Sequence, residues 1–291
     1  MKLKEDILNA IGKEYEEQIA QMGFEIVGDI AIVEFKHELP ENILGKVCDE
    51  IKKHHPSVGV IVKKIGDVSG EFRVGKYEVL NEYDRSKLLE HLPKKYRNLS
   101  PFETLHIEHG CRMLLDISKV YFSSKLGFER KRIAEQVKEN ENVAVLFAGI
   151  GPFPLVIAKH KKARVEGIEL NPYAIEYFHK NLAINKLHGE INIIHADVKD
   201  WLNDRRDLHN YDRIVMPAPK DAPHYLEEVI TKSKPNTIIH YYFFADKQEI
   251  ENRINEIKEK FHEKVEVVYY RTAGSVGTNQ YRVVADIKIL K

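Results

Sequence analysis

The stretch NVAVLFAGIGPFPLVIAKHKKARVEGIELNP, from Asn142 to Pro172, decides the fold. An apolar run from Val143 to Phe147 enters the tight turn Gly149-Ile150-Gly151, and an apolar helical segment follows that turn. A second apolar run, Ala163 to Ile168, ends in Glu169. This order predicts a strand, a glycine turn, a helix and a second strand tipped by a carboxylate.

The glycine turn and the carboxylate together favour a nucleoside-binding site. Glycines at a strand-to-helix turn let the backbone approach a ligand closely, and an acid at the tip of the next strand can accept both ribose hydroxyl protons. Dinucleotides and S-adenosylmethionine (SAM) are both bound in this way. A dinucleotide site requires G-x-G-x-x-G/A, but Pro154 occupies the third small position here. The sequence therefore favours SAM.

A third apolar-leaning run, Asn192 to Ala196, ends in Asp197. An acid at this place commonly holds the adenine amino group in SAM-binding folds. The alternative is that Glu169 and Asp197 are solvated strand ends with no ligand. Their joint occurrence after a glycine turn favours the cofactor site.

The remainder of the chain continues the alternation of strands and helices. Further strands are predicted at Tyr211–Met216, Thr237–Phe244, Lys264–Arg271 and Gln280–Leu290, with helices at Leu126–Val137, Tyr225–Lys232 and Lys247–Phe261. This pattern predicts an α/β fold with a Rossmann-like, doubly wound sheet whose last strand runs antiparallel, which is the class I SAM-dependent methyltransferase fold.

The amino-terminal part predicts a small α+β module. Helices are expected at Leu3–Met22 and Pro40–His55, a hairpin at Phe24–Phe35, and strands at Val58–Lys64 and Gly70–Leu80. We expect residues 1–100 to form an RNA-positioning module and residues 101–291 the SAM-binding domain. A strand pair is expected within Cys111–Phe122.

A basic cluster lies near the end of the first part. Lys94, Lys95, Tyr96 and Arg97 follow Pro93. Basic side chains with an interleaved aromatic ring can follow an RNA backbone and stack a base. The alternative is an exposed linker.

Composition excludes several classes of protein. The 45 basic and 45 acidic residues give a formal net charge of zero, so local patches must carry any binding to nucleic acid. Two cysteines fit neither a disulfide framework nor a zinc cluster, and the spacing of His106, Glu108 and His109 does not fit a metal site. The sequence contains neither a long apolar run nor a signal peptide. We expect a cytoplasmic protein with no metal and no membrane partner.

The motifs of this chain resemble those of the archaeal and eukaryotic tRNA guanine-37 N1-methyltransferases and their wyosine-building relatives. The resemblance runs from about Phe24 to the carboxyl terminus. It is carried by GDIAIVEF, GEFRVGKYEVL, HIEHGC, DISKVYFSSKLGFER, LFAGIGPF, IELNPYA and YDRIVM. The mobile first domain of the family is not expected, because one helix precedes Phe24.

The resemblance implies roles for individual residues. Glu129 matches the general base on guanine N1, and Lys125 is a candidate substrate contact. An ordinary surface glutamate, paired with Arg130 or Arg132, is the alternative for Glu129. The positions implied to contact SAM are Tyr121, Phe147, Ala148, Gly149, Gly151, Glu169, Leu170, Asn171, Asp197, Val198 and Pro217.

Three positions depart from the family pattern. Val145 replaces an aspartate, Ser124-Lys125 replaces proline-arginine, and Pro217 replaces an asparagine. An ammonium at Lys125 cannot reproduce the geometry of a guanidinium. Lys220 or Asp221 could take the place of the missing asparagine.

The resemblance implies methyl transfer from SAM to a purine beside the tRNA anticodon, guanine 37 at N1 or its wyosine precursor, by a monomer. Two alternatives stay open. One is aminocarboxypropyl transfer, as in wyosine relatives, and the other is an RNA-binding paralogue that has lost catalysis.

Overall fold

The computed structural model describes residues 2–66, 72, 74–217, 223–275 and 279–291. The chain divides into two compact units, one formed by residues 1–107 and 112–124 and the other by residues 108–111 and 125–291. Each unit has its own sheet. The functional boundary expected between residues 100 and 101 stays a prediction.

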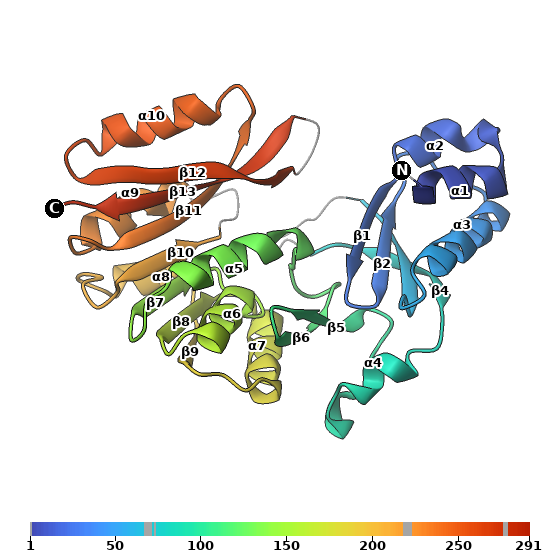
Figure 1. The fold of residues 1–291 in the computed structure, drawn as a ribbon, viewed down its shortest axis with the longest axis horizontal. Coiled ribbons are helices and arrows are strands. Elements are labelled where there is room, and N and C mark those ends of the chain that lie inside the picture. Colours follow the sequence, from blue (N-terminus) through green and yellow to red (C-terminus); the bar gives the residue numbers. More distant parts are fainter. Residues whose placement is uncertain (1, 67–71, 73, 218–222, 276–278) are drawn as a thin grey trace. The chain divides into compact units, whose positions relative to one another are not determined.

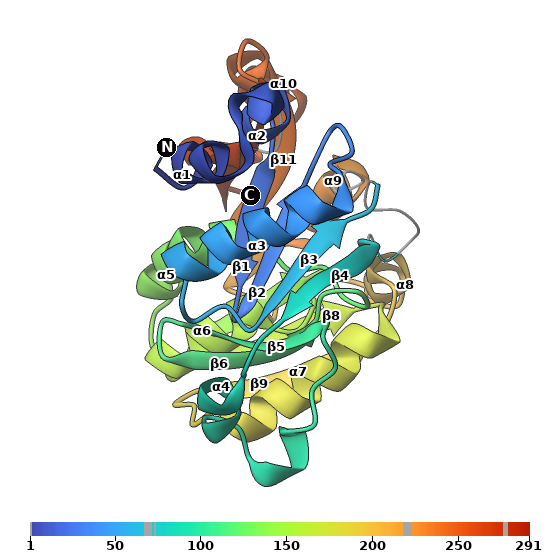
Figure 2. The same cartoon turned by 90° about the vertical axis from the view of Figure 1, so that its right-hand side faces the viewer.

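The first unit is a four-stranded sheet with helices on it. Its elements are α1 (Lys2–Ile11), η1 (Lys13–Tyr15), α2 (Glu16–Ala20), β1 (Gly23–Val27), β2 (Ile30–Glu34), α3 (Glu41–His54), β3 (Val60–Lys64), β4 (Tyr77–Glu82), α4 (Ser86–Glu90) and η2 (Lys94–Tyr96). The strand order is β1-β2-β3-β4, with β2 and β3 parallel and the outer pairs antiparallel. In Figure 2, α3 lies across this sheet.

Apolar packing holds this unit together. Ile7 and Ile11 of α1 and Val47 and Ile51 of α3 share a buried cluster with Ile61 of β3. These helix residues recur at helical spacing, so each helix buries one apolar stripe against the sheet.

The predicted hairpin is confirmed, but the first helix is not continuous. Val27 pairs with Ile30 across the turn at Gly28, whose φ is +57°. The expected helix Leu3–Met22 is interrupted because Gly12 adopts a φ of +110°, which an L side chain rarely adopts. Only the last part of the expected strand Gly70–Leu80 is found, because β4 begins at Tyr77 and continues to Glu82. Residues 70, 71 and 73 lie outside the described residues.

A two-stranded sheet joins β5 (Glu103–Glu108) to β6 (Cys111–Asp116). The strand pair expected within Cys111–Phe122 is therefore wrong, because β6 pairs with the segment that precedes it. Gly110, with a φ of +75°, closes the short turn between β5 and β6.

The second unit is a seven-stranded sheet with the order β12-β13-β11-β10-β7-β8-β9. Its elements are η3 (Ser124–Leu126), which leads into it, α5 (Gly127–Gln136), β7 (Asn142–Leu146), α6 (Pro152–His160), β8 (Arg164–Glu169), α7 (Pro172–Ile184), β9 (Glu190–His195), α8 (Val198–Asn203), β10 (Arg213–Met216), α9 (Pro223–Lys232), β11 (Ile238–Asp246), α10 (Ile250–Lys260), β12 (Val265–Ser275) and β13 (Gln280–Ile289). Figure 1 shows the helices flanking the sheet, with α10 along β12.

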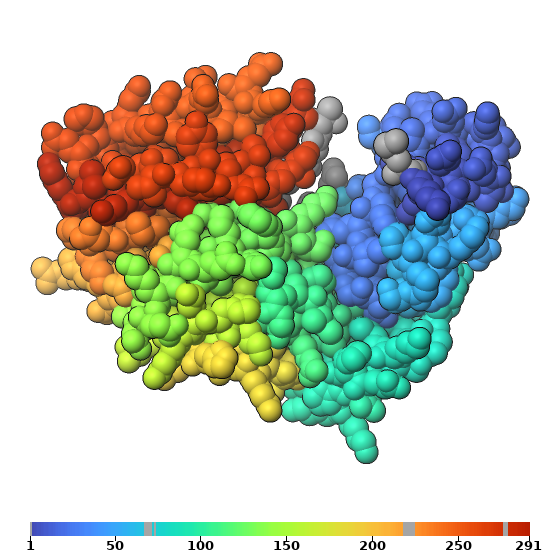
Figure 3. Space-filling model, in the orientation of Figure 1, coloured from blue at the N-terminus to red at the C-terminus, as the bar shows by residue number. Residues whose placement is uncertain are grey.

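The strand directions confirm the predicted fold class. Strands β7, β8, β9, β10 and β11 pair in parallel, whereas β13 runs antiparallel to β11. Parallel strands covered by crossover helices form a doubly wound sheet, and the last strand is reversed as expected. Figure 3 shows the segments of α10 and β12, in orange and red, at the surface. Tyr269 and Tyr270 of β12 are exposed. No helix in the described ranges is long and apolar enough to cross a bilayer.

A buried ion pair links the turn between β1 and β2 to the start of α4 in the first unit. Asp29, 4% exposed, accepts hydrogen bonds from Arg85 Nε at 2.7 Å and Arg85 Nη2 at 2.8 Å. Thr104 Oγ1 donates to the same carboxylate at 2.7 Å. The carboxylate is thus held by donors from two segments distant in sequence.

We expect Arg85→Met to destabilise the protein by about 3–5 kcal/mol, because it leaves the Asp29 charge buried without its partner. Urea unfolding followed by circular dichroism measures the change. The matched control is Lys63→Met, which removes a pair with the exposed Glu38 and should change stability by less than about 1 kcal/mol. Equal effects of the two substitutions would contradict the assignment.

Candidate active site

The glycine turn between β7 and α6 has a backbone that requires glycine. Gly149 and Gly151 have φ values of +56° and +84°. A Cβ on Gly151 would lie 2.1 Å from Cε2 of Phe178. The buried side chain of Asn181 donates to Ile150 O at 3.1 Å and fixes the turn from α7. The turn is therefore tightly packed from behind and offers backbone on its other side.

Glu169 connects the ends of β7 and β8. Its Oε2 accepts a hydrogen bond from Gly149 N at 2.7 Å, and its Oε1 accepts one from Asn171 N at 2.8 Å. Burial raises the pKa of Glu169, although these backbone donors act in the opposite direction. Each carboxylate oxygen has two lone pairs, so both oxygens can also accept ribose hydroxyls.

Asn171 and Asp197 begin the next two helices. Asn171 Oδ1 accepts from Tyr173 N at 3.0 Å at the start of α7, and Asp197 Oδ1 accepts from Lys199 N at 2.7 Å at the start of α8. Ala196 N donates to Glu169 O at 3.0 Å, so Asp197 follows Glu169 along the same edge of the sheet. The capping role gives Asp197 a structural function in addition to the predicted one.

The other predicted cofactor residues lie along this edge. The ring of Phe147 is 5.7 Å from that of Tyr225, and Ala148 N donates to Ile168 O at 2.8 Å. The remaining members are Leu170, partly exposed, Val198, buried, and Pro217, directly after β10. Lys220 and Asp221 lie outside the described residues. Tyr121 belongs to the first unit, so its contact with SAM stays a prediction.

This edge fits SAM. Two glycines in positive φ leave backbone accessible, and the carboxylate of Glu169 is oriented by backbone donors at the carboxyl ends of the parallel strands. Open α/β sheets bind ligands at that edge. Glu169 would hold the ribose hydroxyls, and Asp197 would hold the adenine amino group.

Glu129 is buried, so the alternative of a surface glutamate is wrong about its exposure, although the ion pair with Arg132 that it named is present. Its side chain is 2% exposed. Oε2 accepts hydrogen bonds from Tyr242 OH at 2.9 Å and from Arg132 Nε at 3.0 Å. Oε1 is buried and has no hydrogen-bond partner among the described residues. Arg271 Nε lies 3.7 Å from Oε1 and forms an ion pair with it.

Tyr242 connects Glu129 to the glycine turn. The ring of Tyr242 lies 6.0 Å from the ring of Phe153, which is in the first turn of α6. Burial and the Glu129 charge raise the pKa of Tyr242 well above its usual range, so the phenol stays a neutral donor. The structure thus places the predicted base beside the helix that follows the cofactor turn.

The neighbours of Glu129 in sequence have different surroundings. Arg130 is 1% exposed and forms a bidentate ion pair with Glu108, in which Nη2 is 2.7 Å from Oε2. Lys125 is exposed in η3, before α5. His109 Nε2 lies 2.8 Å from Gly127 O, and His106 Nδ1 accepts from Gly28 N at 3.3 Å. Both histidines therefore contact backbone.

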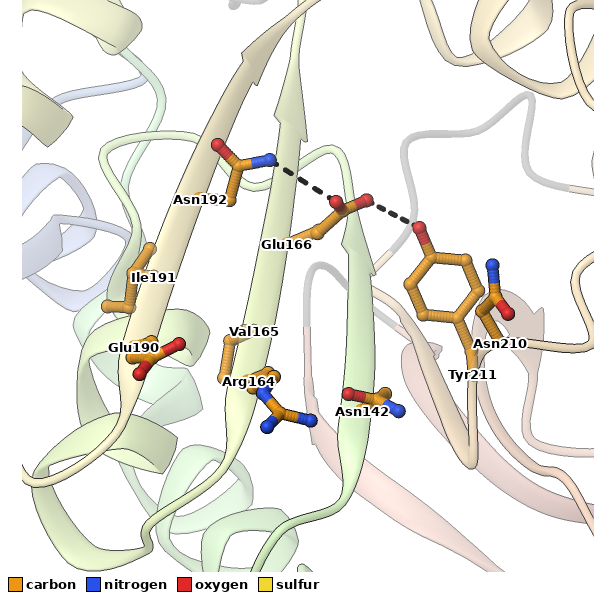
Figure 4. Close-up of a pocket in the computed structure, with 9 residues that line it drawn as sticks. All are labelled: Asn142, Arg164, Val165, Glu166, Glu190, Ile191, Asn192, Asn210 and Tyr211. Carbon is orange, nitrogen blue, oxygen red and sulfur yellow. Dashed lines mark hydrogen bonds between the residues drawn. The ribbon is translucent and has the colours of Figure 1, made fainter.

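A pocket at the opposite edge of the sheet does not belong to this site. Asn142, Arg164 and Glu190, which begin β7, β8 and β9, line it. Figure 4 shows Glu166 at its centre between Asn192 and Tyr211. Asn192 Nδ2 donates to Glu166 at 3.2 Å, and Tyr211 OH donates to its other oxygen. The carboxylate is already paired, as expected for a structural role.

Sequence reasoning missed Asn181 and Tyr242, and it named Arg132 only as a partner of a surface glutamate. Asn181 supports the glycine turn, and the other two bind Glu129. The polar tips in the run TIIHYYFF were the available signal for Tyr242, because a buried tyrosine hydroxyl needs a partner. For Arg132 the signal was its place three residues after Glu129, which allows a pair on one helix face, but ERKR gave no sign that this pair is buried.

Gly151→Ala should abolish SAM binding and lower the melting temperature, because it combines an unfavourable φ with a clash against Phe178. Isothermal titration calorimetry and thermal unfolding test this. Gly45→Ala in α3 is the control, since nothing lies within 4 Å of a Cβ there. It should leave SAM binding unchanged and stabilise the helix by about 0.5–1 kcal/mol. Normal SAM affinity in Gly151→Ala would remove the turn from the site.

The raised pKa of Glu169 predicts that SAM affinity depends on pH. The carboxylate accepts ribose hydroxyls and loses this capacity on protonation, so affinity should fall as the pH decreases. The fall should begin at a higher pH than for an ordinary glutamate. Calorimetry between about pH 5 and pH 8 measures it. Glu169→Gln should bind more weakly throughout and lack this dependence; an unchanged pH profile in that variant would exclude Glu169 as its source.

Comparisons with known proteins agree with this geometry. The profile of the TRM5/TYW2 methyltransferase domain matches residues 104–268, and that of the TYW2 N-terminal domain matches residues 4–81. A tRNA (guanine(37)-N(1))/4-demethylwyosine(37)-methyltransferase, Taw22 of Nanoarchaeum equitans, is 30% identical over 319 residues, covering 92% of this chain and 100% of that protein.

Two further relatives indicate the range of the family. A tRNA(Phe) (4-demethylwyosine(37)-C(7)) aminocarboxypropyltransferase of Methanocaldococcus jannaschii is 31% identical over 237 residues, covering 81% of this chain and 84% of that protein. The solved complex of aTrm5 with tRNALeu has a TM-score of 0.79 at 29% identity, over 99% of this chain and 78% of that one. The chain belongs to the TRM5/TYW2 family of SAM-dependent tRNA-modifying enzymes.

Proposed function

We propose that this protein methylates guanine 37 of tRNA at N1, with Glu129 as the general base. The observation that carries the proposal is the unequal environment of the two Glu129 oxygens. Oε2 has two donors, whereas the buried Oε1 has no hydrogen-bond partner among the described residues. A buried polar atom without a partner is costly, and guanine N1–H is a donor that would satisfy it.

Glu129 can act as a base because its carboxylate is held in one orientation. Arg132 and Tyr242 fix Oε2, so Oε1 is the oxygen that accepts the N1 proton. Bound SAM supplies an electrophilic methyl group. Removal of the proton exposes the N1 lone pair at the time of attack, which is the ordinary contribution of a general base. The proton stays on Oε1 until the product leaves.

The cofactor edge has the complementary task of holding SAM. We assign the ribose to Glu169, the adenine to Asp197 and Val198, and close backbone approach to Gly149 and Gly151. Phe147, Ala148, Leu170, Asn171 and Pro217 complete the proposed site within the second unit, and the role of Tyr121 in binding SAM is proposed from the family resemblance alone. Lys125, exposed before α5, is proposed to contact the substrate.

We further propose that the first unit positions the tRNA. The match of residues 4–81 to the TYW2 N-terminal domain supports this assignment, as does the tRNA complex of a solved relative. Lys94, Lys95 and Arg97 provide basic side chains beside Tyr96, as a backbone-tracking surface requires.

Aminocarboxypropyl transfer is the second candidate function, favoured by the relative from M. jannaschii. The two reactions transfer different groups from the same cofactor. Nucleoside mass spectrometry after reaction with SAM and unmodified tRNA transcripts, or with tRNA carrying 4-demethylwyosine, separates them by product mass. A methylated guanosine supports the first function, and an aminocarboxypropyl adduct supports the second.

Glu129→Gln should reduce the rate of methylguanosine formation by at least about 10²-fold, because glutamine cannot accept the proton. Single-turnover kinetics with guanine-37 transcripts measure the rate. SAM affinity should be unchanged. Glu135→Gln is the matched control on the same helix, since Glu135 is 66% exposed, and it should retain full activity. A fully active Glu129→Gln variant would exclude Glu129 as the base.

A further inference from the structure

Arg132 lies between two buried carboxylates. Its Nε donates to Glu129 Oε2 at 3.0 Å. Its Nη1 and Nη2 donate to Asp286 of β13 at 2.6 Å and 3.1 Å. Asp286 is therefore bound through two nitrogens and Glu129 through one. One guanidinium thus pairs with two carboxylates and makes more hydrogen bonds to Asp286 than to Glu129.

His240 fixes the other side of Asp286. Its Nδ1 is 2.6 Å from Asp286 Oδ1, and its Nε2 is 2.6 Å from Arg213 Nη1. Because a guanidinium can only donate, Nε2 must accept, and Nδ1 carries the proton that is donated to Asp286. Burial lowers the pKa of His240 despite the neighbouring carboxylate. His240 is thus a neutral donor to Asp286.

Asp286 remains an anion in this setting. Burial alone would raise its pKa, but the His240 hydrogen bond and the Arg132 guanidinium hold the pKa of the carboxyl well below its usual range. Its side chain is 3% exposed, so water screens its charge weakly. Asp286 and Glu129 therefore both interact with the positive charge of Arg132.

The remaining groups that face Glu129 come from β11 and β12. Tyr242 of β11 is a neutral hydroxyl donor. Arg271 of β12 has a side chain that is 37% exposed and lies 3.7 Å from Oε1, without a hydrogen bond. Solvent weakens that pair, so Arg132 is the buried cation in direct contact with the carboxylate.

We propose that Arg132 and Asp286 form a positioning pair that sets the basicity of Glu129. Arg132 orients the Glu129 carboxylate through its contact with Oε2. Asp286, held by neutral His240, binds the same guanidinium through two nitrogens, so Arg132 does not interact with Glu129 alone. When the N1–H bond breaks, the proton passes to Glu129 Oε1, and Arg132 and His240 keep theirs. The identity of that proton rests on the proposed function.

The test compares the titration of Glu129 in two variants. Asp286→Asn removes a neighbouring anion and leaves Arg132 to Glu129 alone, so it should lower the Glu129 titration midpoint, whereas Arg132→Gln removes the cation and should raise it. The midpoint is read by NMR of protein labelled with ¹³C at glutamate Cδ, with the signal assigned by its loss in Glu129→Gln. The acid limb of the methyl-transfer rate against pH should move in the same directions.

Glu141→Gln is the matched control. Glu141 accepts from Arg213 Nε at 3.0 Å, at the far end of the same group of charges. This variant makes the same carboxylate-to-amide change as Asp286→Asn but leaves the partners of Arg132 in place. It should lower the melting temperature without moving either the NMR midpoint or the acid limb. A purely structural role for Asp286 would give this same result in Asp286→Asn and would overturn the proposal.

The two readouts separate this proposal from the proposed function. Shifted midpoints in a protein that forms no methylguanosine would support the pair and reject the function. An active enzyme in which Asp286→Asn moves neither midpoint nor limb would reject the pair alone. If Arg132→Gln does not fold, the direction of the shift in Asp286→Asn decides.

Discussion

The parallel register between β7 and β8 is the constraint on which the cofactor-binding edge depends. Leu146 pairs with Ile168, and beyond the end of β7 the backbone continues the ladder through Ala148 N and Ile168 O. This brings Gly149 N to the carboxylate of Glu169. Because side chains alternate along a strand, a slip of one residue would turn Glu169 to the other face. The turn, the carboxylate and the helix start at Asn171 are therefore set by one pairing.

A second constraint is electrostatic and lies under α5. Three side chains of this helix form hydrogen bonds with strands β11 and β13. Glu129 accepts from Tyr242, and both Arg132 and Gln136 donate to Asp286. His240 contacts the same Asp286 carboxylate. Burying a single ion costs several kcal/mol unless it is paired and hydrogen-bonded. Here each charged group has an oppositely charged neighbour. Among the described residues, Oε1 of Glu129 is the oxygen of this carboxylate that accepts no hydrogen bond. The hydrogen-bonded network between α5 and the sheet therefore includes one oxygen, Oε1 of Glu129, that can accept a hydrogen bond from a ligand.

These two constraints differ in how far the sequence reveals them. Apolar periodicity and the glycine turn predict the strands, their alternation with helices and the reversed last strand, because burial of apolar faces dominates those elements. The interruption at Gly12 and the pairing of β6 with β5 depend on backbone conformation and on long-range contact, which periodicity does not record. The residue types of a buried charged cluster do not differ from those of a solvated helix face. The role of Glu129 could therefore be predicted only from the family resemblance. Its pair with Arg132 was expected only for a surface glutamate, and its contact with Tyr242 was not expected.

The departures from the family pattern affect the site unequally. Val145 is fully buried between Val215 and Gly167, where a valine needs no donor and an aspartate would need one. The hydrogen bonds of Glu169 and of Glu129 involve neither Val145 nor Pro217. The proposed cofactor contacts and the proposed base therefore persist beside both substitutions. Among the described residues the buried Oε1 of Glu129 has Arg271 at 3.7 Å but no hydrogen bond. A buried acceptor without a hydrogen bond costs stability, and a bound donor would offset that cost. This cost favours the proposed catalytic role over a paralogue that has lost catalysis.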